Sequence, residues 1–161
     1  MFEREALLNQ MFINYIEMLA NDVTDENLNT RPVETGHTPL WILGHVAICA
    51  ELGIKMLGGD FEHRQWLPAF APGTKDEFTS SDGYSRDEFL SSIKSSYAQL
   101  SEMAQSADDE VLNQPHGVEL LNDTVLNTVG DVVAHLLTTH MAFHAAQLSA
   151  WRQASGHKYL F

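Results

Sequence analysis

The sequence predicts an all-α protein, a four-helix bundle in which long crossover connections, above all residues 60–84 and 108–127, join the helices. Four segments place apolar residues at the three- and four-residue spacing of a helix that packs on one face. Hydroxyl caps, prolines and glycines mark several ends of these segments. The sequence shows no convincing strand alternation, and only residues 118–126 are compatible with a short extended piece. Residues 1–161 are therefore expected to form a single helical domain.

The first two expected helices differ in how clearly their ends are marked. The first runs from about residue 3 to residue 21 and is defined by its apolar face alone. That face is expected to consist of Leu7, Leu8, Met11, Tyr15, Met18 and Leu19. The second begins at Thr38, a hydroxyl N-cap, with Pro39 at the first helical position, and runs to Leu57 before a Gly-Gly pair ends it. Its inward stripe is expected to contain Trp41, His45, Ile48 and Leu52.

The third and fourth expected helices both begin at capping sequences. Residues 85–88 read SRDE, a capping-box signature, and the helix that follows fades near Ala107. Its inner face is expected to contain Phe89, Ile93, Tyr97, Leu100 and Met103. Residues 128–131 read TVGD, a similar box with a shorter acidic partner, and the helix that follows ends before Gly156.

Composition limits where the protein works and what it binds. The chain has 161 residues and a formal net charge of −13, with only 9 lysine and arginine residues. Nucleic acid and anionic membranes are therefore not expected as partners, because phosphate binding needs clustered basic residues. No apolar run approaches the length of about 20 residues that spans a bilayer, and the N-terminus has no signal-peptide layout. The single cysteine, Cys49, rules out an intrachain disulfide, so a soluble, cytoplasmic protein is expected.

Two histidines on the fourth expected helix, His140 and His144, are spaced to bind one metal ion. Positions four residues apart lie one above the other on a helix, so the two imidazoles share a face. The apolar residues of that face are Val129, Val132, Val133, Leu136, Leu148 and Trp151. An alternative interpretation is that both are core or interface histidines whose ring nitrogens are satisfied by hydrogen bonds.

His45 is the third candidate ligand, because it lies on the inward stripe of the second expected helix. Ligands for a metal in a bundle core come from inward positions on different helices. Three protein ligands leave coordination positions open for water, hydroxide or substrate, which is the pattern of catalytic rather than structural sites. A divalent ion is expected, zinc or nickel first, with iron and manganese as alternatives. Cys49, one turn after His45, is either a thiolate ligand or a small buried hydrophobe.

Other residues near this cluster carry weaker signals. Gln147 shares the face of His144 and is expected to orient a histidine or to bind substrate. His135 lies five residues before His140 and is expected to project about 140° away from it, toward solvent, another helix or a partner subunit. Met141 stands where the HExxH metalloproteases have their catalytic glutamate, which argues against that chemistry. Four histidines are expected in loops or near the C-terminus, from which any one could close over the site: His37, His63, His116 and His157. Three aromatic residues are expected in the cavity or the core: Tyr15, Trp41 and Tyr97.

Two segments resemble the DinB/YfiT-like superfamily, a group of small helical proteins that are expected to be metalloenzymes. Residues 41–47, WILGHVA, are similar to the histidine segment of the family's second helix. Residues 135–148, HLLTTHMAFHAAQL, are similar to its final H-x3-H-x-x-Q signature. The family often has Arg-Gly between the last histidine and the glutamine, where residues 145–146 are both alanine here.

This resemblance has implications for both the site and the activity. It implies an up-down-down-up bundle and a metal centre whose ligands are His45, His140 and His144. Members frequently form homodimers, and those with an assigned activity include thiol transferases that use mycothiol, bacillithiol or glutathione, and metal-dependent isomerases and hydrolases. A small-molecule substrate is therefore expected, with a low-molecular-weight thiol as the candidate cosubstrate.

Three classes of function follow from these features. The first is a metal-dependent transferase or hydrolase that activates a thiol or water, since a divalent ion on neutral imidazoles lowers the pKa of either group. The second is a non-catalytic protein that binds a metal or a small molecule, for example in a stress response. The third is a helical interaction protein whose histidines are structural. Metal content, and a loss of stability with chelator, separate the third class from the first two.

Overall fold

The computed structural model describes residues 1–34, 36–79, 82–158 and 160, which form helices joined by turns and loops. These residues contain no β-strand, and one isolated antiparallel bridge joins Pro115 to Thr128. The all-α class is therefore confirmed. The extended piece expected over residues 118–126 is wrong, because backbone hydrogen bonds between near neighbours wind part of it into a 3₁₀ turn, η3 (Glu119–Leu121).

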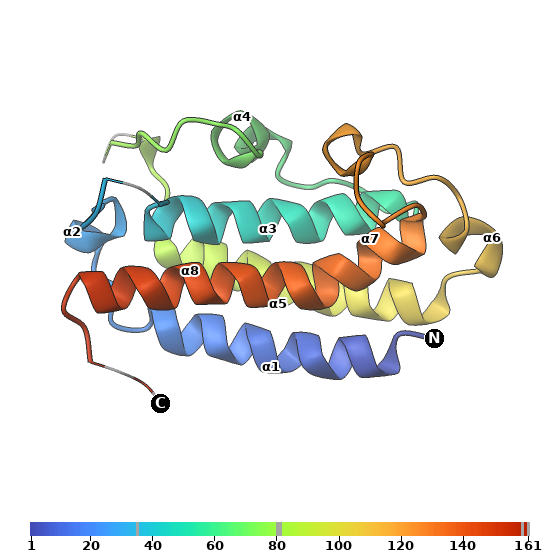
Figure 1. Cartoon of the computed structure of the whole chain (residues 1–161), viewed down its shortest axis with the longest axis horizontal. Coiled ribbons are helices and arrows are strands. Elements are labelled where there is room, and N and C mark those ends of the chain that lie inside the picture. Colours follow the sequence, from blue (N-terminus) through green and yellow to red (C-terminus); the bar gives the residue numbers. More distant parts are fainter. Residues whose placement is uncertain (35, 80–81, 159, 161) are drawn as a thin grey trace.

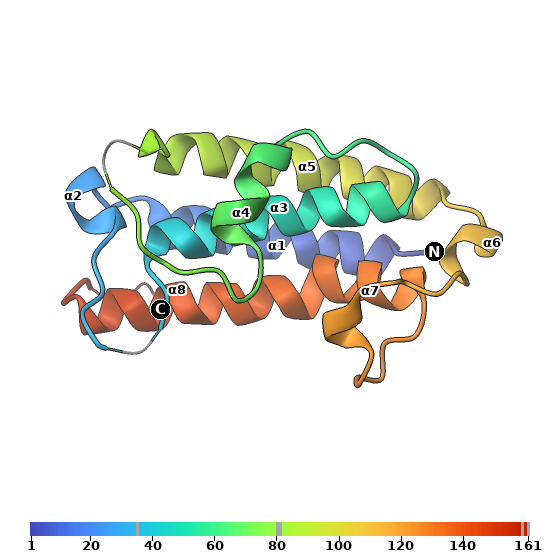
Figure 2. The same cartoon turned by 90° about the horizontal axis from the view of Figure 1, so that it is seen from above.

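Four long helical elements lie along one another (Figures 1 and 2). They are α1 (Glu3–Ala20), α3 (Pro39–Met56), α5 (Arg86–Ser106), and a fourth, continuous element made of α7 (Val129–His135), η4 (Leu136–His140) and α8 (Met141–Ala154). In Figure 1, α1 and α8 run in one direction along the molecule, and α3 and α5 run in the other. The connections hold shorter helices: α2 (Asp25–Leu28), η1 (Arg64–Trp66), α4 (Leu67–Phe70) and α6 (Asp109–Leu112).

The starts of three long helices are capped as the sequence predicts. The Thr38 hydroxyl accepts a hydrogen bond of 3.2 Å from the backbone N–H three residues on, and a proline follows it. Ser85 accepts a hydrogen bond from the N–H three residues on in the same way, which is one half of the capping box expected at residues 85–88. Thr128 and Asp131 form a reciprocal capping box, in which each side chain accepts from the other's backbone N–H. These bonds satisfy N–H groups that the first helical turn leaves without a partner.

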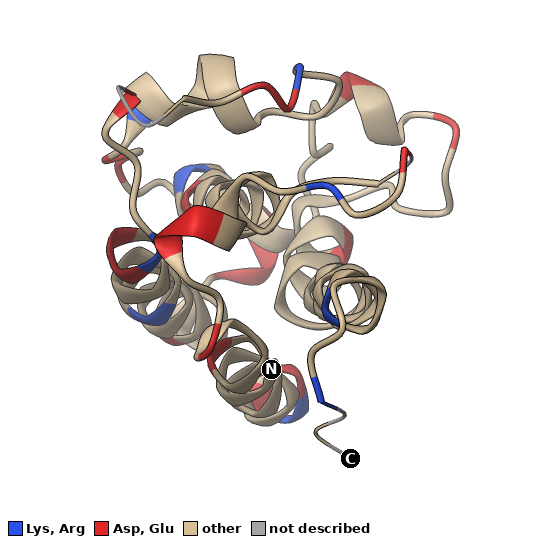
Figure 3. Ribbon diagram, turned by 90° about the vertical axis from the view of Figure 1, so that its left-hand side faces the viewer, with Lys and Arg blue, Asp and Glu red and all other residues tan. Residues whose placement is uncertain are grey.

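The central helix is α3, which packs against α5, α8 and α4. Trp41, His45 and Ile48 of its expected stripe are buried, and Leu52 is half-buried. Contrary to the expectation that no apolar run approaches a bilayer-spanning length, the segment Pro39–Met56 is long and apolar enough to cross a membrane. However, 83% of it is buried inside the fold, as in a core helix. Figure 3, an end-on view, shows acidic residues spread over several elements rather than gathered in one patch.

The buried face of α1 differs from the expected one. Leu7, Leu8, Met11 and Met18 are exposed, with Leu7 73% accessible. Of the expected residues, Leu19 is buried and Tyr15 is half-buried. The rest of the inward face consists of Asn9, Ile13, Ile16 and Ala20. Apolar residues stand on both sides of this helix, so their spacing alone does not select a face, and a polar residue lies on the inner one. The amide of Asn9 donates a 3.0 Å hydrogen bond to the carbonyl oxygen of Leu137, which joins α1 to η4.

Close packing of α4 on α3 depends on a glycine. A Cβ atom added to Gly44 would lie 2.5 Å from Cδ1 of Phe70, whose ring is fully buried. Only a residue without a side chain therefore lets the Phe70 segment approach α3 this closely. Figure 2 shows the result, with α4 lying over α3.

Replacing this glycine tests the packing directly. Gly44→Ala is expected to reduce the free energy of unfolding by about 1–3 kcal/mol, because the added methyl group overpacks a buried ring. Urea unfolding measures the loss. In a double-mutant cycle, the loss is expected to be smaller in a Phe70→Leu background, where the ring is absent. A Gly44→Ala protein as stable as the wild type would contradict the close approach of the two helices.

Candidate metal centre

His45 projects from the middle of α3 with one ring nitrogen already engaged. Its Nδ1–H donates a hydrogen bond of 2.8 Å to the carbonyl oxygen of Phe70 in α4. Trp41, one turn earlier, stacks on the imidazole with ring centroids 4.6 Å apart. Because the proton resides on Nδ1, the lone pair of His45 lies on Nε2. That nitrogen is directed toward the fourth helical element.

His144, on α8, is oriented in the same manner by a different acceptor. Its Nδ1–H donates a 2.8 Å hydrogen bond to Oε1 of Gln147, one turn further along the helix. The lone pair of His144 is therefore also on Nε2. Metal-binding histidines typically donate their second ring N–H to a carbonyl or carboxylate, which fixes the tautomer and the ring orientation. The orienting role that the sequence suggested for Gln147 is what the structure shows.

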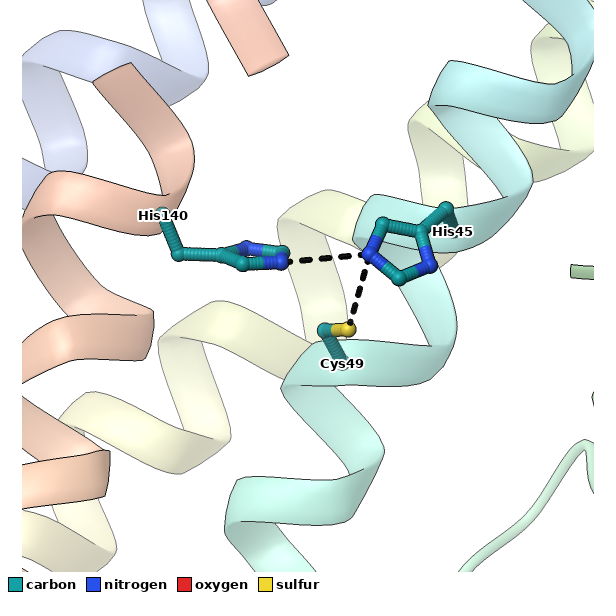
Figure 4. A group of neighbouring side chains, drawn as sticks. All are labelled: His45, Cys49 and His140. Atoms are coloured by element: carbon teal, nitrogen blue, oxygen red, sulfur yellow. Dashed lines mark hydrogen bonds between the residues drawn. The ribbon is translucent and has the colours of Figure 1, made fainter. Parts of the chain in front are cut away.

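The nearest nitrogen and sulfur atoms of the cluster are spaced as the ligand atoms of one metal ion would be. Nε2 of His140 lies 3.3 Å from Nε2 of His45, and Sγ of Cys49 lies 3.6 Å from that same nitrogen (Figure 4). In a tetrahedral zinc site with ordinary bond lengths, two nitrogens are about 3.3 Å apart and a sulfur and a nitrogen about 3.6 Å apart. The ligand atoms of His45, Cys49 and His140 all lie within 4.8 Å of one another. Both the donor types and their spacing fit a divalent metal ion.

All three histidines expected as ligands gather at this place. Their ring centroids are 5.2 Å apart for His45 and His140, 4.7 Å for His45 and His144, and 4.4 Å for His140 and His144. His45 and His140 are common to two candidate ligand sets. The set completed by Cys49 has its three ligand atoms within 4.8 Å of one another (Figure 4). The set completed by His144 rests on the closeness of the three imidazole rings.

Burial controls the charge of these groups. It lowers the pKa of His45 and lowers the pKa of His144 to about 3, and in both cases the other histidines nearby contribute to the shift. The pKa of His140 is well below its ordinary value for the same reasons, burial being the larger. Burial also raises the pKa of the Cys49 thiol to about 12. At neutral pH the imidazoles are therefore neutral and ready to bind a metal, whereas the thiol keeps its proton unless a metal displaces it.

A π-helical segment changes which side chains face the cluster. The sequence predicts that His135 points about 140° away from His140, which is true only of an ideal α-helix. In η4 (Leu136–His140) the turn is wider, and residues five apart come close to alignment. The two rings are consequently 5.6 Å apart, and His135 lines the same cavity. The expected position of His135 is therefore wrong, because the helix is not α-helical between the two histidines.

A cavity of about 420 Å³ opens beside the histidine cluster. Its polar edge includes Gln147 and His37, which precedes the cap of α3. The His37 ring stacks on Trp41 with centroids 3.6 Å apart, and its Nδ1 lies 3.4 Å from the carboxylate of Asp76. The sequence placed His37 in a loop, as one of four histidines that could close over the site.

The other loop histidines lie away from the cavity. His63 pairs with the buried carboxylate of Glu51 at 2.5 Å, His116 bonds within its own loop, and His157 pairs with Asp22. Among the aromatic candidates, Trp41 lines the cavity, whereas Tyr97 is fully buried on α5 and Tyr15 lies half-buried on α1. The loop histidines other than His37 therefore have structural contacts of their own.

The family profile of the DinB superfamily matches residues 11–148, which is most of the chain. The protein therefore belongs to the DinB superfamily, as the two histidine segments indicated. A search of curated proteins found no match. The chain is thus a DinB-like protein, and its cluster of histidine and cysteine side chains allows it to bind a metal ion.

Acid sensitivity of the metal-free protein tests the state of these histidines. Its free energy of unfolding is expected to decrease as pH falls below 6.5, the ordinary pKa of histidine. The pKa values of the cluster are lowered in the folded state, so below this pH the unfolded chain binds more protons. Each of these histidines lowers the free energy of unfolding by up to about 1.4 kcal/mol for each pH unit of acidification.

Urea unfolding from neutral pH down to about 5.3, roughly one unit above the ordinary pKa of glutamate, measures this slope. The stabilisation is fully present above the ordinary histidine range and is lost progressively as pH falls toward the lowered values. A His144→Gln variant is expected to show a shallower slope, since one proton-linked group is removed. A stability that stays constant over this range would show that the rings are not held neutral by burial.

Proposed function

We propose that the protein binds one divalent metal ion through His45, His140 and His144 and is a metal-dependent transferase or hydrolase acting on a small molecule. One observation carries the proposal: the Nδ1–H groups of His45 and His144 both donate to carbonyl oxygens, which leaves the Nε2 lone pairs for a metal. A divalent ion held by neutral imidazoles lowers the pKa of a bound thiol or water and supplies a nucleophile near neutral pH.

The surroundings of the cluster support a catalytic use of the metal. The adjoining volume of about 420 Å³ is of the size that holds a small molecule. Gln147 positions His144, and the Phe70 carbonyl positions His45, so neither ligand needs to reorganise on binding. The directions of the long helices fit the up-down-down-up bundle of the family, whose resemblance suggests a thiol as cosubstrate. Zinc or nickel is the ion we expect first, in a cytoplasmic protein.

A second function is favoured by Cys49. Its sulfur lies 3.6 Å from Nε2 of His45, a separation that fits a fourth ligand. Three imidazoles and one thiolate would close the coordination sphere, and closed tetrahedral sites are structural rather than catalytic. The protein would then be a non-catalytic metal-binding module.

Metal content of untagged protein, purified without a metal-affinity column, tests the ligand set. Wild-type protein is expected to carry about one ion per chain, and His144→Ala is expected to lose most of it, because second-sphere and ligand losses reduce affinity strongly. His116→Ala removes a loop histidine outside the cluster and is expected to keep the metal. Chelator is expected to lower the Tm of the wild type more than that of His144→Ala. Equal metal content in wild type and His144→Ala would exclude His144 as a ligand.

The same measurement of metal content tests whether the Cys49 thiol is a metal ligand. Cys49→Ala is expected to retain its metal if the site is the open, three-imidazole one. Loss of the metal in Cys49→Ala, with unfolding unchanged in the metal-free state, would favour the closed site instead.

We also propose that the protein forms a homodimer through the exposed side of α1. The apolar residues exposed there are Leu7, Leu8, Met11 and Met18. A stripe of this kind on a helix of a soluble protein is commonly covered by a partner, and a second copy with a two-fold axis would place each stripe on its counterpart.

Charge placed in the middle of this stripe is expected to separate the subunits. Size-exclusion chromatography with light scattering is expected to show a dimer for the wild type and a monomer for Met11→Glu, because a dimer would bury the carboxylate. Val125→Glu adds the same charge at an 89% exposed position on another element and is expected to remain dimeric. A wild-type protein that is monomeric at high concentration would contradict the proposed interface.

A further inference from the structure

The cavity beside the histidine cluster has an unusual lining. Among the described residues that line it there is no lysine, arginine, aspartate or glutamate. The walls are instead mainly apolar and include Leu52, Val118, Leu120, Leu121, Leu136 and Phe143. The polar groups are five histidines, one glutamine and Cys49. A bound molecule would thus meet hydrogen-bonding groups on one side of the cavity and hydrocarbon elsewhere.

The balance of charges in this cavity restricts the charge of the ligand that can bind there. Imidazole binds a metal as a neutral ligand, so the ion would keep its full charge of about +2 among the histidines. No carboxylate in the lining compensates that charge. The carboxylate of Asp76, 3.4 Å from Nδ1 of His37, lies outside the lining and pairs with Arg31 at 3.0 Å. A low-dielectric cavity with an uncompensated cation favours a ligand that brings a negative head group to the metal.

A ligand with further charges would not be accommodated. Each additional carboxylate or ammonium group would leave water for an apolar wall without a partner of opposite charge, which costs several kcal/mol per unpaired ion by general estimates. The overall charge of −13 also repels polyanions from the surface. The cavity therefore discriminates against molecules such as glutathione, which carries two carboxylates and an amine.

The mouth of the cavity extends this apolar character to the surface. Leu120 and Phe143 line the cavity and are nevertheless 69% and 60% exposed. They come from different elements, the loop around η3 and helix α8, and stand at the same opening. An apolar ligand that covers these two side chains removes them from water, which stabilises the bound state.

On the metal function proposed above, we infer that the protein acts on a molecule with an apolar body and a single ionisable head group, a monothiol or a monocarboxylate. The head group lies at the histidine cluster, and the body lies between Leu52, Leu136 and the wall formed by Val118 and Leu121. Leu120 and Phe143 close over the end of the body nearest the solvent. This ligand class differs from the charged thiols that the family resemblance alone suggests.

Binding to the cobalt-substituted protein tests this ligand class without an assay of activity. Benzyl mercaptan, glutathione and phenylacetate are titrated separately, and the change in the cobalt absorption spectrum gives each Kd. The two thiols ionise in the same range, so the comparison between them isolates the body of the molecule. Benzyl mercaptan is expected to bind at least about tenfold more tightly than glutathione. Phenylacetate carries a carboxylate in place of the thiol of benzyl mercaptan, so the two Kd values show which head group binds more tightly.

A pair of matched variants locates the discrimination in the cavity. Leu120→Lys places a cation at the mouth and is expected to weaken benzyl mercaptan and strengthen glutathione. Val125→Lys makes the same change at an 89% exposed position on the same connection, outside the lining, and is expected to alter neither Kd. Glutathione binding as tightly as benzyl mercaptan to the wild type would overturn the inference.

Two other outcomes are distinguishable. If cobalt binds with histidine ligation and none of the three probes changes its spectrum, the ligand class is wrong while the metal centre stands. If the cluster binds no cobalt, the proposed metal function fails and the ligand class fails with it.

Discussion

The hydrogen bond from Nδ1–H of His45 to the carbonyl oxygen of Phe70 is the contact on which the candidate metal centre depends. It fixes the tautomer of the histidine and directs the Nε2 lone pair into the cluster. The carbonyl is in place because Gly44 admits the Phe70 ring against α3. The segment that carries it is held in turn by the pair of Glu51, almost fully buried on α3, and His63. A long connection that is irregular in sequence is thus part of the site.

The π-helical turn η4 is the second constraint, and it acts on the opposite wall of the cavity. Its wider turn brings His135 and His140 to one face, where an α-helix would separate them. The carbonyl of Leu137 within the turn accepts a hydrogen bond from Asn9, so a polar residue belongs on the inner face of α1. Helical irregularities of this type are often associated with functional sites. Here the irregularity adds a histidine to the cavity.

The parts of the fold with local causes were predictable from the sequence, and those with tertiary causes were not. Hydroxyl caps and glycines gave the helix ends, and a four-residue spacing placed His140 and His144 together. The buried face of α1 was mispredicted, because apolar residues occur on both sides and the inner side includes Asn9, whose partner is 128 residues away. His37 was expected only as one of four loop histidines, because its position depends on Asp76, a residue on a distant part of the chain. The π-helical turn has no periodic signal in the sequence.

In the function that we propose, the metal site is open, with imidazoles as its protein ligands and Cys49 outside the coordination sphere. X-ray absorption at the metal edge of the zinc-loaded protein, without added thiol, distinguishes this open site from a closed one. We predict a first shell of nitrogen and oxygen at about 2.0–2.2 Å with the scattering pattern of imidazole, and no sulfur at about 2.3 Å. A sulfur scatterer in the wild type that disappears in Cys49→Ala would contradict the claim and would make the site a closed one.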